Sequence, residues 1–127
     1  MDSLPQPLLT AMVSVYRGAE WIQGCLENLR EQTLFAQGLL QVVVIDARSP
    51  ESEKSLVRPF LRKNPTRILY RRTWRRVTLY SAWNLAIRIT SSRYLTSANV
   101  DDRHRMDALE RLVEVLEGDS DVDGVYA

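Results

Sequence analysis

The chain has 127 residues, 45% of them hydrophobic and 26% charged, and its formal net charge is +1. This length accommodates one domain with a single core, and the composition is ordinary for a soluble globular chain. The small net charge excludes a global attraction to nucleic acid or to an anionic membrane. Only Lys54 and Lys63 are lysines, so the cations are almost all arginine, whose planar fork suits carboxylate and phosphate groups.

Two features of the sequence bear on location. Cys25 is the only cysteine, which excludes an internal disulfide and a zinc site built from several thiolates. The opening stretch MDSLPQPLLTAMVSV has no basic region and contains two prolines, unlike a signal peptide, and no apolar stretch is long enough to span a membrane. We therefore expect a cytoplasmic protein without a membrane span.

Apolar periodicity predicts strands that alternate with helices along the chain. Ile22, Cys25, Leu26 and Leu29 recur at the i, i+3, i+4 and i+7 spacing of an amphipathic helix, whereas 39–46 is a continuous β-branched run typical of a central parallel strand. In chain order we expect a strand at 8–16, a helix at 19–33, a strand at 39–46, a helix at 51–62, a strand at 66–72, a helix at 78–89, a strand at 93–98, a helix at 106–116 and a fifth strand beginning in VDGVYA.

This alternation predicts an α/β fold with a Rossmann-like, largely parallel sheet flanked by helices. Ligands in such folds bind at the carboxyl ends of the strands, near a switch in strand order. Asp46 and the segment 99–102 both follow predicted strands and are therefore candidate site residues.

The segment 99–102 has two interpretations. Mg²⁺ and Mn²⁺ bind through one or two carboxylates together with substrate phosphates, and Asn99 and Asp101 are spaced so that both side chains project to one side of an extended chain. Alternatively, Asp101 or Asp102 caps the helix that follows. The residues themselves favour the two equally, and both can hold for neighbouring positions.

Asp46 and a cluster of arginines also have two interpretations each. A carboxylate at position 46 can accept a hydrogen bond from a base or a ribose, or it can cap the turn that follows. In RRTWRR, Arg71, Arg72, Arg75 and Arg76 flank Trp74; such a cluster can grip a diphosphate or stack on bases, although a solvated loop is its commoner meaning.

Missing motifs exclude several classes. No G-x-G-x-x-G follows the first strand, which disfavours a dinucleotide-binding domain, and no P-loop sequence is present. A response-regulator receiver domain needs acidic residues after the first strand and a lysine after the fifth, yet the first strand ends in SVYR and no lysine follows Lys63.

Several sequence patterns that are typical of one protein family occur in this chain, in the same order along the sequence. SVYR keeps Tyr16 of the pattern P-x-Y-N, with Ser14 and Arg17 at the other two positions, and IDARSPE keeps Asp46 and Ser49 of V-D-D-G-S-x-D. The segment AWNLAIRITSSRYLTSANVDDRH matches A-R-N-x-G/A-I, G-x-Y-I and D-x-D-D through Ala82, Asn84, Ala86, Ile87, Tyr94, Leu95, Asp101 and Asp102. Together the segments resemble the nucleotide-binding half of family 2 glycosyltransferases, which have the GT-A fold.

The resemblance implies a role for each matched position. Tyr16 would lie against the base, Asp46 would bond the base or ribose, and Asn99 would take the ribose-facing position of a D-x-D variant. Asp101 would coordinate a Mg²⁺ or Mn²⁺ ion that bridges the diphosphate, with Asp102 in support and also the expected helix cap. The full set of expected nucleotide-binding residues is Ser14, Tyr16, Arg17, Asp46, Asn84 and Asn99. From charge and position we add Arg75 and Arg76 as diphosphate contacts.

The resemblance therefore implies a glycosyltransferase of inverting type, with an unknown acceptor and a nucleotide-diphosphate sugar as donor, which we expect to be a UDP-sugar. Residues 1–127 are expected to be a single donor-binding domain that stops before the acceptor-binding half and its catalytic base. A non-catalytic nucleotide-sugar-binding domain of a larger assembly is the alternative. A nucleotidyltransferase is disfavoured because its glycine-rich, lysine-containing first loop is missing. A fifth strand cut short leaves a free sheet edge, which predicts self-association.

Overall fold

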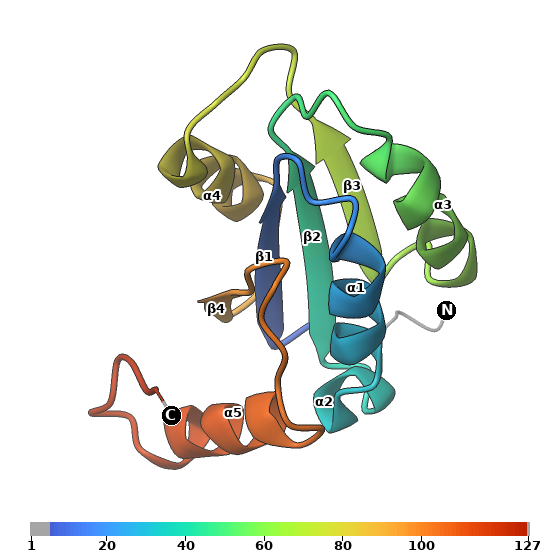
Figure 1. The fold of residues 1–127 in the computed structure, drawn as a ribbon. Coiled ribbons are helices and arrows are strands. Elements are labelled where there is room, and N and C mark those ends of the chain that lie inside the picture. Colours follow the sequence, from blue (N-terminus) through green and yellow to red (C-terminus); the bar gives the residue numbers. More distant parts are fainter. Residues whose placement is uncertain (1–5, 127) are drawn as a thin grey trace, which may run out of the picture.

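A four-stranded parallel sheet forms the centre of the chain (Figure 1). The computed structural model describes residues 6–126. The strands are β1 (Leu9–Val15), β2 (Leu40–Asp46), β3 (Ile68–Arg72) and β4 (Tyr94–Ser97), in the spatial order β3-β2-β1-β4. The helices are α1 (Ile22–Arg30), α2 (Thr33–Ala36), α3 (Glu53–Lys63), α4 (Leu79–Arg88) and α5 (Ala108–Gly118). The predicted Rossmann-like α/β fold is confirmed.

The strand register brings the carboxyl ends of three strands to one edge. Val15 of β1 lies opposite Asp46 of β2, and Asp46 lies opposite Arg72 of β3. The chain leaves β1 toward β2 on one side and later returns to β4 on the other side, so the strand order switches at β1. This is the place where open α/β sheets bind ligands.

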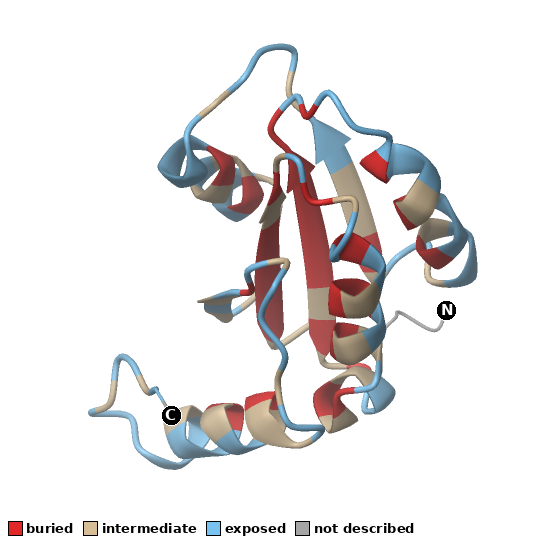
Figure 2. Cartoon of the chain, viewed as in Figure 1, coloured by how far each residue is buried: buried red, intermediate tan, exposed pale blue. Residues whose placement is uncertain are grey.

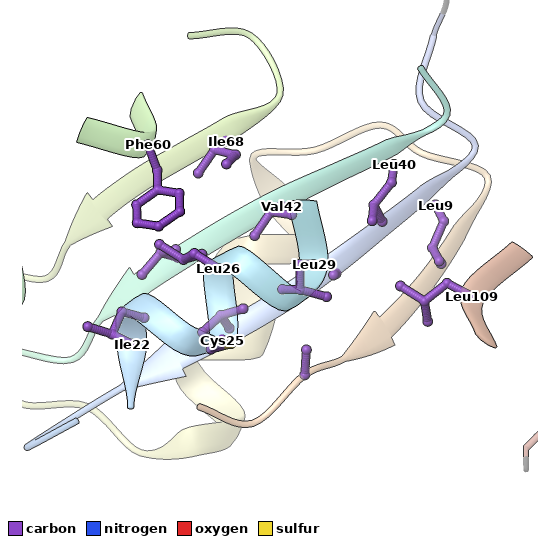
Figure 3. Packing of buried hydrophobic residues seen from close by; sticks show 14 of the residues in the cluster. Leu9, Ile22, Cys25, Leu26, Leu29, Leu40, Val42, Phe60, Ile68 and Leu109 are labelled. Atoms are coloured by element: carbon purple, nitrogen blue, oxygen red, sulfur yellow. The ribbon is translucent and has the colours of Figure 1, made fainter. Parts of the chain in front are cut away.

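The helices cover the two faces of the sheet unequally. One cluster of buried residues packs α1, α3 and α5 against the sheet, and Figure 3 shows Leu26 and Leu29 of α1 lying over Val42 of β2. On the other face α4 alone packs on the strands, through Ala82 and Ala86. Figure 2 shows the consequence: β1 and β2 are almost wholly buried, whereas the end of β3 is exposed.

Local sequence explains where several elements begin and what they bury. The apolar positions predicted for α1 are its buried face, because Ile22, Cys25, Leu26 and Leu29 are all at most 2% exposed. Burial raises the pKa of the Cys25 thiol to about 11, as expected for a small apolar core residue. Thr78 caps α4, since its hydroxyl accepts a hydrogen bond from the Ser81 N–H at 3.1 Å.

Three local expectations are wrong. VDGVYA contains no strand within its described part, because the Val122 N–H bonds back to the Asp119 carbonyl at 3.1 Å and the segment pairs with no strand. The last helix begins at Ala108, so Met106 lies outside it and is exposed. Its N-cap position is Asp107, which means that neither Asp101 nor Asp102 caps this helix.

No helix in the part of the chain that the structure describes is long and apolar enough to cross a membrane. The expected cytoplasmic location stays a prediction.

Candidate functional site

A cavity of about 590 Å³ opens at the carboxyl ends of β1 and β2. The chain segment that runs from β3 to α4 forms its other wall. Its lining residues are Ser14, Tyr16, Ala47, Arg76, Val77, Thr78 and Leu79. The cavity therefore lies at the edge where the strand order predicts a ligand.

Two arginines lie beside the ring of Tyr16, which lines this cavity. The Arg76 guanidinium lies 4.2 Å from the centroid of the Tyr16 ring, and the Arg17 guanidinium lies 5.7 Å from it. Both distances are in the range of a cation–π contact. Arg17 has a φ of 53°, which turns the chain sharply as it leaves β1. The result is an aromatic ring held beside two positive charges, an arrangement suited to a planar, anionic ligand.

Asp46 lies buried behind the cavity, in a polar network of its own. The side chain is 2% exposed; Oδ1 accepts a hydrogen bond from the Ser49 N–H at 2.8 Å, and Oδ2 accepts one from the Tyr70 hydroxyl. The Arg72 Nε lies 3.7 Å from Oδ2. Burial and the bond to Asp46 raise the pKa of Tyr70 far above its ordinary value. The structure thus shows the turn-capping role of Asp46, and its contact with a nucleotide stays a prediction.

The loop that follows β1 is held by side chains from the loop that follows β2 and from the first residue of α3. Three successive backbone N–H groups, at residues 17–19, donate to Ser49 Oγ at 2.9 Å, Glu53 Oε2 at 3.1 Å and Glu51 Oε1 at 3.0 Å. Glu53 is fully buried, and its second oxygen has no hydrogen-bond partner among the described residues. A Cβ at Gly18 would lie 2.7 Å from a Val15 methyl, so this tight loop requires glycine.

The acidic segment 99–102 lies beside the same loop, next to Gly18. Val100 lies beside Gly18, because a Cβ at Gly18 would be 3.4 Å from a Val100 methyl. The Asp102 N–H bonds to the Asn99 carbonyl at 3.0 Å, which closes a turn. The Arg103 guanidinium donates to the Val100 carbonyl at 2.8 Å. Residues 16–18 therefore join the cavity, through Tyr16, to the acidic turn, through Gly18.

The acidic turn offers a partial set of metal ligands. Asp101 and Asp102 are exposed, and neither is in an ion pair with another described residue. Among residues 6–126, no three His, Cys, Asp or Glu side chains gather closely enough to hold a metal ion by themselves. Two free carboxylates with a neighbouring amide fit Mg²⁺ or Mn²⁺ when a diphosphate supplies further oxygens, because these ions bind readily through one or two carboxylates plus substrate phosphates.

The structure brings some predicted site residues together and separates others. Ser14, Tyr16 and Arg76 line one cavity, with Arg17 beside the ring. Asn84 lines a different cavity, of about 410 Å³, together with Ser81, Ile87 and Arg88 on α4. Arg75 stacks on Trp74, 5.0 Å from its ring, and lines a third cavity. Nucleotide binding by each residue stays a prediction.

Sequence reasoning missed Tyr70, Glu51 and Glu53 as supports of this site. Glu51 and Glu53 lie in the helix predicted at 51–62 and Tyr70 lies in the strand predicted at 66–72, and no motif marks them as site residues. The one available signal was SPESE, where acidic residues gather before a helix. It did not show that the carboxylates turn back onto the loop after β1.

A sequence model of glycosyl transferase family 2 matches residues 10–126. No curated protein matches the chain. Among solved structures, the mannosyltransferase PcManGT from Pyrobaculum calidifontis, in complex with GDP-Man and Mn²⁺, is 27% identical with a TM-score of 0.78. That match covers 88% of this chain and 33% of the mannosyltransferase.

A second protein has the same fold. Residues 1–349 of S. aureus TarS are 17% identical with a TM-score of 0.77, over 87% of this chain and 32% of that protein. The same TarS fragment also matches in its complexes with UDP and with UDP-GlcNAc. At this identity the likeness to TarS concerns the fold alone. The chain spans about a third of the length of both proteins.

Proposed function

The chain belongs to glycosyl transferase family 2 and has a GT-A, Rossmann-like fold, and we propose that it forms the donor-binding part of a nucleotide-sugar-dependent glycosyltransferase. One observation carries the proposal: the Tyr16 cavity and the acidic turn flank the same loop at the switch in strand order. We propose that a bound nucleotide places its base in the cavity and its diphosphate at the acidic turn.

We assign the nucleoside to the cavity. Tyr16 offers a ring face for the base, and Ser14 offers a hydroxyl at the end of β1. The Arg76 guanidinium lies over the Tyr16 ring, from which it would stack on the base or donate to the phosphates. Asp46 keeps the loop after β2 in place through its bonds to Ser49 and Tyr70, and its expected bond to a base or ribose stays a prediction.

We assign the diphosphate to the acidic turn. Asp101 and Asp102 would hold a Mg²⁺ or Mn²⁺ ion with the donor's phosphates, Asn99 would lie on the ribose side, and Arg76, which lines the donor cavity, would add positive charge. When bound, the ion supplies charge neutralisation for the departing nucleoside diphosphate. In the transfer itself, an acceptor hydroxyl oxygen bonds to the anomeric carbon as the bond from that carbon to the diphosphate oxygen breaks.

The hydroxyl proton of the acceptor goes to a general base, and we propose that the base and the acceptor site belong to a further part of the protein. Residues 1–127 then act as a donor-binding domain. The matched mannosyltransferase, about three times as long as the matched region, supports this division.

The donor is a UDP-sugar or a GDP-sugar. Our expectation from the sequence is UDP. The mannosyltransferase that binds GDP-Man is 27% identical to this chain, whereas TarS, which binds UDP-GlcNAc, is 17% identical. The higher identity favours GDP.

Thermal unfolding tests the proposal. UDP or GDP with Mn²⁺ should raise Tm, and the metal-dependent part of the rise should be absent from an Asp101→Ala/Asp102→Ala variant. Asp123→Ala, an exposed acid on the segment after α5, is the matched control and should respond as the wild-type chain does. If neither nucleotide shifts Tm, or if the double variant keeps the metal response, the donor-site assignment is wrong.

A further inference from the structure

The positive charge of the chain is concentrated in one stretch. Between Glu53 and Asp101 the sequence has no Asp or Glu, although it holds eleven of the Lys and Arg residues. This stretch contains most of α3, all of β3, α4 and β4, and the loop from β3 to α4. The net charge of +1 therefore conceals a strongly basic region balanced by acidic residues elsewhere.

Part of this basic region is hollowed into a cavity of about 470 Å³. Its walls come from the end of β3, from the loop after it and from α4. The cationic and aromatic lining residues are Arg71, Arg72, Arg75, Arg88 and Trp74, and the polar ones are Thr73 and Ser81. No carboxylate lines it, and it shares only Val77 with the cavity that holds Tyr16.

Three of the four guanidinium groups have no anionic partner within residues 6–126. Arg72 is engaged elsewhere, because it lies 3.7 Å from Asp46 and donates to the Ser49 carbonyl at 3.0 Å. Arg71, Arg75 and Arg88 form no ion pair with any described residue. Like charges that converge without a counter-charge repel one another, and a bound anion relieves that repulsion.

The arrangement is more than a solvated arginine loop. Arg71 is the second-last residue of β3, Arg75 lies on the loop and Arg88 lies in the last turn of α4, so the cationic residues of this cavity come from three separate segments. Trp74 is 80% exposed, with the Arg75 guanidinium 5.0 Å from its ring, and Figure 2 shows the loop between β3 and α4 as largely exposed. An indole ring and several guanidinium forks suit an organic ligand that carries a phosphate.

We propose that this cavity binds a phosphate ester, at a site separate from the donor cavity. Arg71, Arg75 and Arg88 donate to the phosphate oxygens, and Trp74 covers the organic part of the ligand. The phosphate belongs to a soluble ester or to a lipid headgroup; the chemistry at the cavity is the same. The proposal goes beyond the donor-binding function and does not depend on it, since it requires neither metal nor nucleotide.

Nuclear magnetic resonance on the full chain tests this site. Glycerol 3-phosphate is titrated at about 0.01 M salt, where the screening length is about 30 Å, and the arginine Nε–H and tryptophan indole N–H signals are followed. We expect saturable shifts at Arg71, Arg75, Arg88 and Trp74, unchanged when UDP and Mn²⁺ are present. Arg71→Gln/Arg88→Gln should weaken binding about tenfold or more.

The control is Arg58→Gln/Arg62→Gln, which removes the same charge from exposed positions of α3, on the other face of the sheet, and should change the affinity less than about twofold. The site is refuted if shifts fail to saturate, if they spread evenly over all arginines, if both double variants lose binding equally, or if UDP displaces the ester. Heteronuclear spectra of each variant show that it is folded.

Vesicles of phosphatidylglycerol then identify the source of the phosphate. The site is assigned to a lipid headgroup if the chain co-sediments with the vesicles, if glycerol 3-phosphate competes with this binding, and if the Arg71→Gln/Arg88→Gln variant no longer co-sediments. Binding of the soluble ester without co-sedimentation assigns it to a soluble ligand. Co-sedimentation without any binding of glycerol 3-phosphate refutes the cavity as a phosphate site.

Discussion

Replacing Tyr70 by Phe removes one hydrogen bond from a buried carboxylate. The Tyr70 hydroxyl donates to Asp46 Oδ2, and the Asp46 side chain is 2% exposed, so water does not readily replace the lost donor. A hydrogen bond to a charged group contributes about 1.5–3 kcal/mol. The remaining contact of Oδ2 is the Arg72 Nε at 3.7 Å, which is too long for a hydrogen bond.

We expect Tyr70→Phe to lower the free energy of unfolding by about 2 kcal/mol, the middle of that range. An unfolding entropy of about 2.1 cal/mol/K per residue gives about 0.27 kcal/mol/K for 127 residues, so Tm falls by about 7 °C. Urea unfolding followed by circular dichroism measures the first quantity, and a thermal scan measures the second.

The pH dependence of this difference supplies a second test. Because the folded state raises the pKa of Tyr70, its contribution is complete below the ordinary tyrosine pKa of about 10 and is lost as the pH rises through the raised value. The stability gap between the wild-type chain and Tyr70→Phe should therefore narrow above about pH 10.

Tyr80→Phe is the matched control, because Tyr80 is 73% exposed and packs edge-on against Trp83 through its ring, which phenylalanine keeps. It should change stability by less than about 0.5 kcal/mol. The reasoning is refuted if Tyr70→Phe changes stability no more than Tyr80→Phe does, or if the gap stays constant at alkaline pH.

Three further predictions concern other parts of the chain. Arg48 is exposed and has a φ of 68°, so Arg48→Gly should raise the free energy of unfolding by about 1 kcal/mol in urea unfolding. Hydrogen bonds from Thr33 and Gln37 lower the pKa of Glu110; the attachment of α5 to α2 is therefore present above about pH 4.3 and weakens as the pH falls, which amide hydrogen exchange in α5 measures. The predicted fifth strand is absent from the described residues, so the expected self-association is assigned instead to the edge strand β4. It should make sedimentation depend on concentration, and Leu95→Lys should abolish it.

Each of these has a contrary outcome. Arg48→Ala retains a Cβ at positive φ and should gain little, so an equal gain from alanine would show that strain is not the cause. If the hydrogen-exchange protection of α5 falls with decreasing pH in a Glu110→Ala variant as much as in the wild-type chain, the effect belongs to another titrating group. Strictly monomeric sedimentation at high concentration would contradict self-association.

The order of strands and helices was predictable because buried positions recur with the periodicity of the helix or strand that contains them. The β-branched run of β2 is buried on both faces, and the helical spacing from Ile22 to Leu29 is the buried face of α1. Both signals arise from contacts with the core, which every residue of the pattern makes. Elements that depend on one or two distant contacts leave no such period.

The local errors follow from that distinction. Helix α2 was not predicted; it is four residues long and depends on the bond from the Thr33 N–H to the Met106 carbonyl, at 2.8 Å. The start of α5 was misplaced because Asn28 holds the His104 backbone by two hydrogen bonds of 2.8 Å, which delays the helix to Ala108. Alternating residues in VDGVYA resemble a strand, but a strand forms only where a neighbour accepts its hydrogen bonds.

The candidate site was predictable in its position and not in its internal contacts. The strand ends that carry Tyr16 and Asp46 follow from the pattern of a parallel sheet. The bond between Asp46 and Tyr70 depends on the register of two strands, and the bond from Gly18 to Glu53 depends on how two loops meet. Single residues carry no signal for either contact.

The uneven coverage of the sheet gives the two faces different local stability. The buried cluster beneath α4 contains five residues, two of them alanines, whereas the cluster on the opposite face contains eighteen. Because the fully buried cluster under α4 is the smaller one, we expect α4 to open at a lower free energy than the helices of the opposite face. Because Val77, Thr78 and Leu79 line the Tyr16 cavity, each such opening dismantles the cavity while the sheet stays folded. Ligand affinity is thereby tied to a local equilibrium of α4, and a bound ligand protects this face far more than it protects the rest of the molecule.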